Sequence, residues 1–321
     1  MAVNDVRVPT MLVLRGLGLG DLLAGVPALR GLRRAHPGHR IVLATPASLA
    51  GLLPLIGAVD ELLDVRGTGP VPYEEPGIAV NLHGSGPQSV EALLRTRPAR
   101  LLTHAHPAFP QVTGPPWPAG VHEVTRWCAM LEWYGVPADP SDILLLPPST
   151  LAGSRGHVIV HPGAAYPARR WPPRRFAEVA AELRAAGHRV LVTGGAAERD
   201  LALEVAALAG LPEEQVLAGR TDVAGLAALV AAARLVICGD TGVAHLATGF
   251  ATPSVVLFGP ISPALWGPPP LERHVALWAG RSGDPHGGTP DPGLLEIGVP
   301  EVLDAAARLL APARRAPTPV R

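Results

Sequence analysis

The stretch that decides the fold is AARLVICGDTGVAHLATGFATPSVVLFGP, residues 232–260. Two short apolar runs within it, 234–238 and 254–258, have the length and the Val and Ile content of buried parallel strands. A turn containing Gly239 and Gly242 and a short helical segment separate the two runs. A strand, a helix and a second strand in this order predict one unit of a parallel sheet covered by helices.

The same alternation extends along the chain on both sides of this unit. In the first half, the apolar run 11–15 leads into a glycine-rich turn, and apolar positions then recur at helical spacing over 21–35. The second half starts afresh with the apolar run 157–161. The sequence therefore predicts two α/β units of similar size. Further strands are expected at 41–44, 61–65, 78–82, 99–103 and 188–193, and further helices at about 122–134, 173–186, 198–209 and 223–233.

Residues 147–156 mark the point where the two units separate, because they are rich in Pro, Ser and Gly. We therefore expect an N-terminal domain at residues 1–150 and a second domain at residues 151–299. A final segment, 300–321, is expected to form a helix followed by a frayed tail.

Composition excludes several classes of function. The 321 residues carry 27 basic and 27 acidic side chains, and this balance argues against nucleic-acid binding through a global basic field. No Lys occurs in the sequence, which excludes Schiff-base and P-loop lysine chemistry. Cys128 and Cys238 lack the spacing of a zinc knuckle. Because the N-terminus lacks a signal-peptide pattern and no apolar run reaches about 18 residues, we expect a cytoplasmic protein.

The glycine-rich turn after the first strand carries a candidate catalytic acid. The sequence GLGLGD, residues 16–21, differs from the dinucleotide pattern GxGxxG because Asp21 stands at the third glycine position. A carboxylate there would repel a pyrophosphate at the helix N-terminus. Asp21 either caps the following helix or presents its carboxylate to the crevice where open α/β sheets bind ligands. The residues alone leave both interpretations open.

The sequence DTGVAH, residues 240–245, is a candidate phosphate site. It places Thr241 and Gly242 at the start of a helix, where free N–H groups and the helix dipole favour an anion. His245 lies four residues after Thr241 and therefore on the same helical face. A helix cap followed by a packed histidine is the alternative explanation.

A second group of candidate binding residues follows the strand at 157–161. Gly163 would let the backbone approach a ligand closely, and Arg169 and Arg170 would supply charge-assisted hydrogen bonds to phosphate. Two solvated arginines over a packed indole explain the same pattern. Glu198, after the next strand, has the chemistry to accept a ribose hydroxyl, although a turn and a helix start account for it equally well.

Several catalytic motifs are missing from the sequence. It contains no D-x-D, which often holds a divalent metal on a sugar diphosphate, and no G-x-S-x-G, H-E-x-x-H or GxxxxGK[ST]. Any phosphate charge would then be balanced by Arg, His and helix N-termini. We therefore expect neither a metal nor another cofactor.

Three segments in the same order, 15–21, 161–183 and 232–260, resemble the ADP-heptose lipopolysaccharide heptosyltransferases of glycosyltransferase family 9. The resemblance implies a GT-B architecture, in which two Rossmann-like domains face each other across a cleft. It implies that the second domain binds most of the donor nucleotide and that a final helix returns to the N-terminal domain. It also implies that Asp21 is the catalytic base, with Gly18 and Gly20 on the acceptor side.

The resemblance also assigns donor binding to residues of the second domain. Arg169 stands where family members commonly have Lys, so the positive charge is kept while its geometry changes. The donor-binding residues that the resemblance and the motifs together indicate are Gly163, Arg169, Arg170, Glu198, Asp240, Thr241, Gly242 and His245.

The expected function is that of an inverting, metal-independent glycosyltransferase. It would move a heptose-like sugar from a nucleotide-diphospho-sugar, ADP-linked, to a hydroxyl of a cell-envelope glycan or glycolipid. We expect a monomer that binds no nucleic acid and has at most peripheral contact with the inner face of the cell membrane. A catalytically silent sugar-nucleotide-binding protein and an epimerase or hydrolase of the same fold are the alternatives. The broken GxGxxG pattern disfavours an NAD-linked oxidoreductase.

Overall fold

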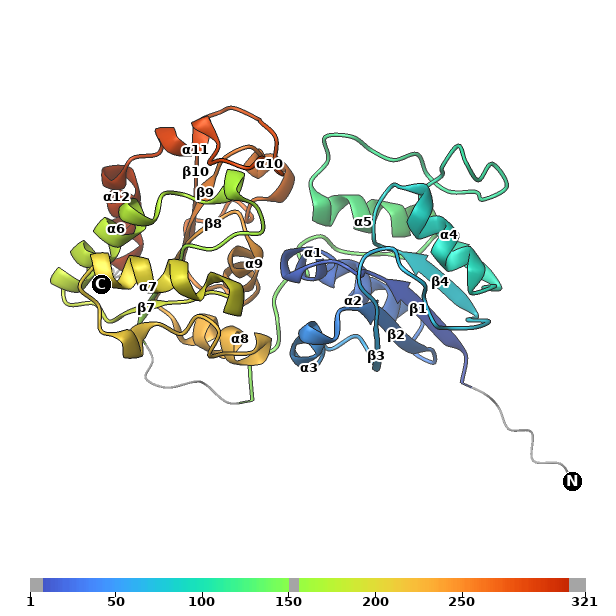
Figure 1. Cartoon of the computed structure of the whole chain (residues 1–321). Helices are drawn as coiled ribbons and strands as arrows, with labels where there is room; N and C mark the ends of the chain where they lie inside the picture. Colours follow the sequence, from blue (N-terminus) through green and yellow to red (C-terminus); the bar gives the residue numbers. More distant parts are fainter. Residues whose placement is uncertain (1–7, 150–155, 312–321) are drawn as a thin grey trace, which may run out of the picture.

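The computed structural model describes residues 8–149 and 156–311, which form two domains lying side by side (Figure 1). The N-terminal domain contains a parallel sheet with the strand order β3-β2-β1-β4-β5. The boundary expected between residues 150 and 151 lies outside the described residues. The five strands are β1 (Thr10–Leu14), β2 (Arg40–Thr45), β3 (Glu61–Asp64), β4 (Ile78–Asn81) and β5 (Arg100–Leu102).

The C-terminal domain contains a second five-stranded parallel sheet, so the prediction of a parallel sheet in each half is confirmed. Its strand order is β10-β9-β8-β6-β7. The edge strand β10 is absent from the sequence prediction, although it contains most of the apolar run 275–279, and it is only partly buried. The strands are β6 (Val158–His161), β7 (Val190–Val192), β8 (Leu235–Gly239), β9 (Ser254–Phe258) and β10 (His274–Trp278).

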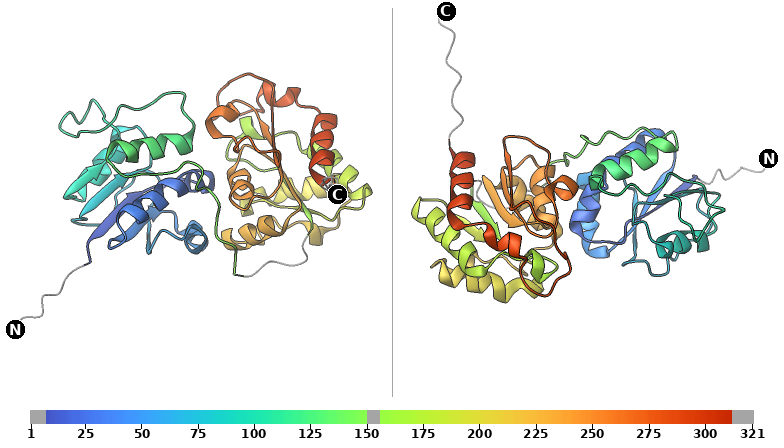
Figure 2. Two further views of the ribbon diagram at one scale, coloured as in Figure 1. Left: turned by 180° about the vertical axis from the view of Figure 1, so that it is seen from behind. Right: turned by 90° about the horizontal axis from the view of Figure 1, so that it is seen from above.

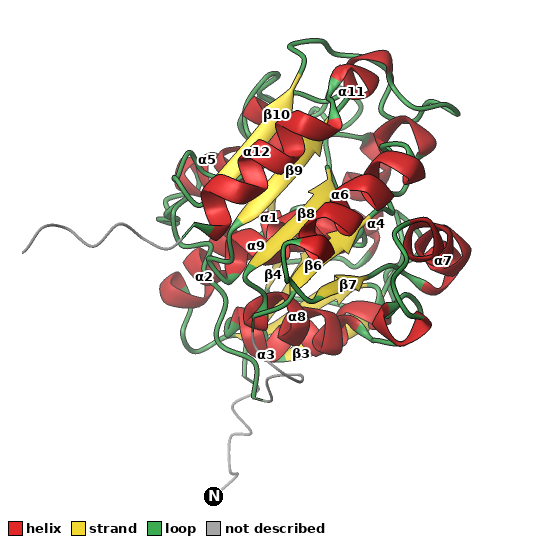
Figure 3. Cartoon of the chain, turned by 90° about the vertical axis from the view of Figure 1, so that its left-hand side faces the viewer, coloured by secondary structure: helices red, strands yellow, loops and turns green. Residues whose placement is uncertain are grey.

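Helices cover both faces of the C-terminal sheet, and Figure 3 shows α6 and α12 in front of its strands. Alternate residues of β9 point to opposite faces, so that Val255 and Leu257 pack with α6 and α12 while Val256 and Phe258 pack on the α9 side. The helices of this domain are α6 (Pro173–Ala185), α7 (Arg199–Leu208), α8 (Val223–Ala232), α9 (Gly242–Gly249), α10 (Pro263–Trp266), α11 (Pro292–Glu296) and α12 (Val299–Leu310).

The N-terminal domain departs from the sequence prediction at its first helix. The single helix expected over 21–35 is two helices, which meet at Gly25. Pro27 lies in the first turn of the second helix, where its missing N–H costs no helical hydrogen bond. The first helix begins at Leu19, ahead of the expected start. The helices of this domain are α1 (Leu19–Ala24), α2 (Val26–Ala35), α3 (Leu53–Ile56), α4 (Pro87–Arg95) and α5 (Glu123–Trp133).

The last described helix, α12, corrects a second expectation. The family resemblance implied that the final helix packs back on the N-terminal domain, but α12 packs against α6, β8 and β9 of its own domain. Its buried face consists of Val302, Ala305, Ala306 and Leu310, which join the apolar core beneath α6. These apolar side chains are buried within their own domain, because α12 covers one face of the C-terminal sheet. The tail expected after it lies outside the described residues.

The two domains meet where α1 packs against α9, in the centre of Figure 1 and again in the views of Figure 2. Glycines permit this close approach. A Cβ atom at Gly242 would lie 2.7 Å from Cβ of Leu19, and one at Gly20 would lie 3.0 Å from Cδ2 of His245. Residues from both domains therefore share one apolar cluster that runs through this contact.

No helix in the part of the chain that the structure describes combines the length and hydropathy needed to cross a membrane.

Candidate active site

The predicted site residues lie at the carboxyl ends of parallel strands in both domains. Asp21 follows β1, the loop 161–170 follows β6, and Asp240 follows β8. β1 and β6 are also the strands beside which each sheet reverses its order, the position where open α/β sheets bind ligands. Because α1 contacts α9, these ends face one another across the domain boundary.

Asp21 is the third residue of α1, and Gly18 is the N-cap. The N-cap is therefore Gly18 and not Asp21, although Asp21 lies in the first turn, where a carboxylate favours the helix dipole. Its side chain is 32% exposed, and its Oδ1 lies 3.7 Å from Nη2 of Arg15. Burial raises the pKa of the Asp21 carboxyl above its usual value, while Arg15 lowers it and Glu123 raises it further. A raised pKa makes this carboxylate a better proton acceptor than one held only by a helix N-terminus.

Arg169 and Asp240 form an ion pair in the C-terminal domain. Nη1 of Arg169 lies 3.6 Å from Oδ2 of Asp240, and the Asp240 side chain is 7% exposed. Burial raises the pKa of Asp240, and Arg169 opposes this shift. Nε of Arg169 and Oδ2 of Asp240 are both buried with no hydrogen-bond partner among the described residues. Buried polar atoms are normally paired, so these two atoms indicate a place where a polar ligand binds.

Glu198 lies directly against Gly163, so two predicted donor residues are brought together. Its carboxylate occupies the space that a side chain at position 163 would need. Oε2 of Glu198 accepts a hydrogen bond from the N–H of Gly195 at 2.7 Å and lies 3.9 Å from Nε2 of His161. The sequence predicted a glycine for close approach of a ligand, whereas the structure shows that it makes room for this carboxylate.

Arg170 and Trp171 shape the loop between β6 and α6. Nε of Arg170 donates a hydrogen bond to the carbonyl of Ala164 at 2.9 Å. Trp171 is buried, and its indole N–H donates to the carbonyl of Ile297 at 3.0 Å. These contacts fold the loop back on itself and hold Arg169, in the short helix Pro167–Arg169, beside Asp240.

Thr241 and Gly242 begin α9, as the sequence predicted. Thr241 is the N-cap and has an extended backbone, but its side chain makes no capping hydrogen bond. His245 packs against Gly20 and makes an edge contact with Trp266, with ring centroids 5.9 Å apart. Burial lowers the pKa of His245 to about 4, so the ring is neutral near neutral pH. It can therefore donate a hydrogen bond to an anion without adding positive charge.

Arg15 and Glu123 are site residues that the sequence analysis did not identify. Arg15 is fully buried, and its Nη2 lies 3.0 Å from Oε1 of Glu123. The sequence carried part of the signal for Arg15, because this residue directly follows a buried strand and begins the glycine-rich segment 15–21. Its partner lies 108 residues away, in a helix that showed no functional pattern.

A second contact joins the domains beside His245. Nε2 of His122 donates a hydrogen bond to the carbonyl of Gly267 at 3.0 Å, and its Nδ1 accepts one from the N–H of Val124. A largely apolar cavity of about 420 Å³ lies next to this contact and is lined by both domains. The two domains are therefore connected on the side of the boundary where α5 faces α10.

Within residues 8–149 and 156–311, no group of three or more His, Cys, Asp or Glu side chains is placed to hold a metal ion. The family model described as Glycosyltransferase family 9 (heptosyltransferase) matches residues 138–287, which include the loops after β6 and β8. Slightly less than half of the chain is therefore similar to glycosyltransferase family 9.

Among curated relatives, Lipopolysaccharide heptosyltransferase 2 of Salmonella typhimurium is 34% identical to this chain over 134 residues. The match covers 40% of this chain and 37% of that relative. The chain therefore matches little more than a third of the length of this curated relative.

Two solved structures show that this chain has the GT-B fold that the resemblance implied. A glycosyl transferase of family 9 from Veillonella parvula has a TM-score of 0.76 and 22% identity, and the match covers 95% of this chain and 98% of that one. An Escherichia coli heptosyltransferase solved with ADP has a TM-score of 0.71 and 18% identity, with 94% and 99% covered.

Proposed function

We propose that this protein is an inverting glycosyltransferase that uses a nucleotide-diphospho-sugar without a metal ion. The proposal rests on two buried atoms next to the N-terminus of α9, Nε of Arg169 and Oδ2 of Asp240, which have no hydrogen-bond partner in the described structure. A guanidinium and free helical N–H groups bind a diphosphate, and a carboxylate oxygen accepts hydrogen bonds from sugar hydroxyls. A nucleotide-diphospho-sugar supplies both kinds of group in one ligand.

The position of Asp21 supports its role as the base. In an inverting transfer, the acceptor oxygen attacks the anomeric carbon as the bond from that carbon to the diphosphate oxygen breaks. The acceptor proton passes to the Asp21 carboxylate, and the electron pair of the broken bond leaves with the nucleoside diphosphate. Asp21 projects from the N-terminal domain opposite the donor loops, close enough that its charge raises the pKa of Asp240. A base on that side can act on an acceptor that approaches from the face opposite the leaving group.

Arg169 and the N-terminus of α9 would stabilise the leaving diphosphate. Negative charge grows on the diphosphate in the transition state, and fixed N–H groups and guanidinium groups stabilise such charge without reorganising. The Arg169 side chain is 21% exposed, so it is reachable from the cleft and only partly screened by water. These groups, with the neutral His245 ring as a further hydrogen-bond donor, would make a metal ion unnecessary.

The donor and acceptor are proposed from the named relatives. A heptose carried on ADP fits the match to the family 9 model, the Salmonella typhimurium relative named a lipopolysaccharide heptosyltransferase, and the Escherichia coli heptosyltransferase solved with ADP. The acceptor would be a hydroxyl of a cell-envelope glycan or glycolipid, reached by a monomer in peripheral contact with the inner face of the membrane. Gly163, Arg170, Glu198, Thr241 and Gly242 would line the donor site, and Gly18 and Gly20 the acceptor side.

A transfer assay tests this function. The protein is incubated with ADP-heptose and truncated lipopolysaccharide in excess EDTA, and both ADP release and the glycosylated product are measured. Product with inverted anomeric configuration supports the proposal. Release of ADP without acceptor indicates a hydrolase, and isomerised donor without ADP release indicates an epimerase. Binding of the donor without any turnover indicates a silent sugar-nucleotide-binding protein.

A further inference from the structure

Arg15 links Asp21 to the interior of the N-terminal domain. Nε of its side chain, which is 1% exposed, donates to the backbone carbonyl of Asp21 at 2.8 Å, and Nη1 donates to the carbonyl of Leu82 beyond β4. Nη2 lies 3.0 Å from Oε1 of Glu123 and 3.7 Å from Oδ1 of Asp21. The guanidinium therefore lies between two carboxylates and is closer to Glu123.

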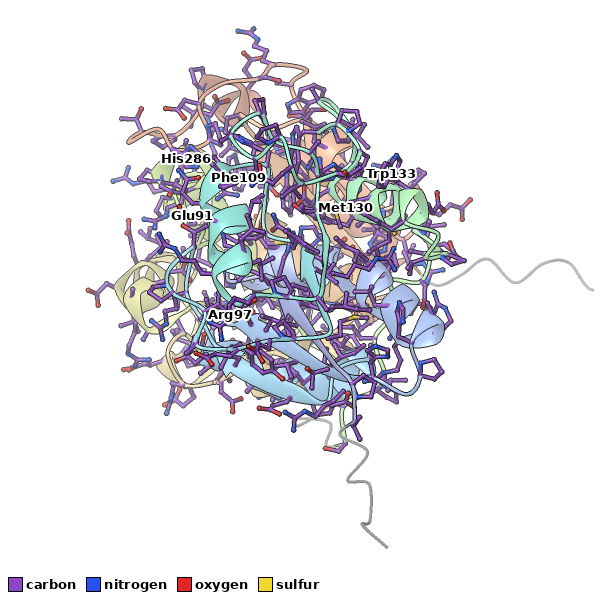
Figure 4. All side chains as sticks on the ribbon, turned by 90° about the vertical axis from the view of Figure 1, so that its right-hand side faces the viewer. Glu91, Arg97, Phe109, Met130, Trp133 and His286 are labelled. Carbon is purple, nitrogen blue, oxygen red and sulfur yellow. The ribbon has the colours of Figure 1, made fainter. Side chains whose placement is uncertain are left out.

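Both carboxylate oxygens of Glu123 are occupied. Oε1 also accepts a hydrogen bond from the indole N–H of Trp127 at 2.8 Å, and Oε2 accepts one from Nη1 of Arg126. Glu123 and Trp127 lie on the buried face of α5, whereas Trp133, labelled in Figure 4, is 51% exposed at the end of the helix. A buried charge is tolerated when it is fully hydrogen-bonded, so Glu123 is a fixed counter-charge for Arg15.

We propose that Arg15 and Glu123 form a positioning pair for Asp21. Arg15 anchors the start of α1, and the charge of Glu123 keeps Arg15 from binding the Asp21 carboxylate in a tight ion pair. The carboxylate then stays free to accept a proton. This inference rests on the proposed role of Asp21 as the base. The pKa directions agree with it, because Arg15 lowers the pKa of Asp21 and Glu123 raises it.

The remaining groups around Asp21 contribute less charge near neutral pH. Burial lowers the pKa of His83 and of His245 to about 4, which leaves both rings neutral. The nearby carboxylate of Asp240, in the C-terminal domain, forms an ion pair with Arg169. The charge balance at Asp21 is therefore set chiefly by Arg15 and Glu123. The other titratable groups are His83 after β4, Asp240 after β8 and His245 on α9.

The test is the titration of the Asp21 side chain by carbon-13 NMR, in full-length protein labelled at the aspartate carboxyl carbons, with Asp21→Asn to identify the resonance. Glu123→Gln keeps the shape of the side chain and removes its charge. We expect it to lower the midpoint of the Asp21 titration by about one pH unit, because an unbalanced guanidinium favours the carboxylate. Glu123→Asp keeps the charge and should stay near the wild-type midpoint. So should Glu132→Gln, which lies on the exposed face of α5.

Two results with single variants would overturn the proposal: an unchanged midpoint in Glu123→Gln, or equal shifts in Glu123→Gln and Glu123→Asp. If Glu123→Gln does not fold, the double variant Arg15→Met with Glu123→Gln provides the test, because it removes both charges of the buried Arg15–Glu123 pair together. Removing the cation should raise the Asp21 midpoint above that of the wild type. A midpoint at or below the wild-type value in the double variant would also overturn the proposal.

Activity measurements separate this inference from the proposed function. In the transfer assay, the acidic limb of the kcat/KM profile of Glu123→Gln should move to lower pH by the same interval as the NMR midpoint. If the wild type transfers no sugar, the proposed function fails, while the NMR midpoints still decide the charge balance. A shifted midpoint with an unmoved acidic limb would overturn the positioning role, because the titration of Asp21 would then not control the reaction.

Discussion

Nη1 of Arg169 lies 3.6 Å from Oδ2 of Asp240, and each side chain keeps a buried polar atom without a hydrogen-bond partner in the described structure. The pair joins the loop after β6 to the loop after β8, on either side of the point where the C-terminal sheet reverses its strand order. A ligand that carries both phosphate and hydroxyl groups would satisfy both atoms.

The first prediction concerns Arg169. Replacing it with Ala should lower kcat by about a hundredfold and change the KM for the donor less, because the lost charge matters most when the diphosphate leaves. Arg169→Lys should recover part of kcat, since it restores the charge without the planar fork. Steady-state kinetics with ADP-heptose measure both constants. A rise in KM with unchanged kcat would show that Arg169 binds ground state and transition state equally.

The second prediction concerns the glycine at the start of α9. Gly242→Ala places a Cβ atom 2.7 Å from Cβ of Leu19, so it should destabilise the protein by about 1–3 kcal/mol, as overpacking does. The free energy of ADP binding should change much less than the free energy of unfolding, because the substitution keeps the backbone N–H of residue 242. Urea unfolding and calorimetry measure the two quantities. Gly38→Ala is the control, since a Cβ at Gly38 meets no atom within 4 Å. Equal stability of the two variants would contradict the close packing of α1 and α9.

The third prediction concerns acid stability. Burial lowers the pKa of His245 to about 4, whereas an unfolded chain binds this proton near pH 6.5. Stability linked to the neutral ring is therefore present above pH 6.5 and is lost as the pH falls towards 4. His245→Gln should reduce the loss of unfolding free energy between pH 7 and pH 5 by about 2 kcal/mol. Urea unfolding at both pH values measures it, with the exposed His286→Gln as control. The same loss in His245→Gln and the wild type would show that His245 is not held neutral.

The alternation of strands and helices was predictable, because buried parallel strands have continuous apolar sequences. The run at 254–258 coincides with β9, and the run at 157–161 includes all of β6. β10 was not predicted, although the apolar run 275–279 overlaps it. The apolar stripe of α12 shows that the helix packs on a surface, but it does not show which domain provides that surface.

The candidate site was predictable where residue type and local spacing carry the signal. Asp240, Thr241 and Gly242 begin a helix as expected. The partnership of Arg15 with Glu123 was not predictable, because the two lie 108 residues apart and meet only when α5 packs against α2. Gly163 was selected for an expected ligand, although the structure shows that it accommodates Glu198.

The fourth prediction concerns Asp21. Asp21→Asn keeps the shape of the side chain but cannot accept the acceptor proton, so turnover should fall by about a hundredfold or more. Because Gly18 is the N-cap of α1, the substitution should cost no more than about 1 kcal/mol of stability through the helix dipole. Turnover with truncated lipopolysaccharide and thermal unfolding check the two effects. Near-normal turnover would eliminate Asp21 as the base.

The most direct test of the account is a calorimetric titration with ADP in excess EDTA. Every other step of the proposed transfer depends on a metal-independent diphosphate site in the C-terminal domain. We expect one ADP to bind per chain, and Arg169→Ala to weaken binding by about tenfold, the loss of one charge-assisted contact. Arg174→Ala, an exposed arginine at the start of α6, should bind like the wild type. Absence of binding, binding that EDTA abolishes, or equal weakening in both variants would contradict the account.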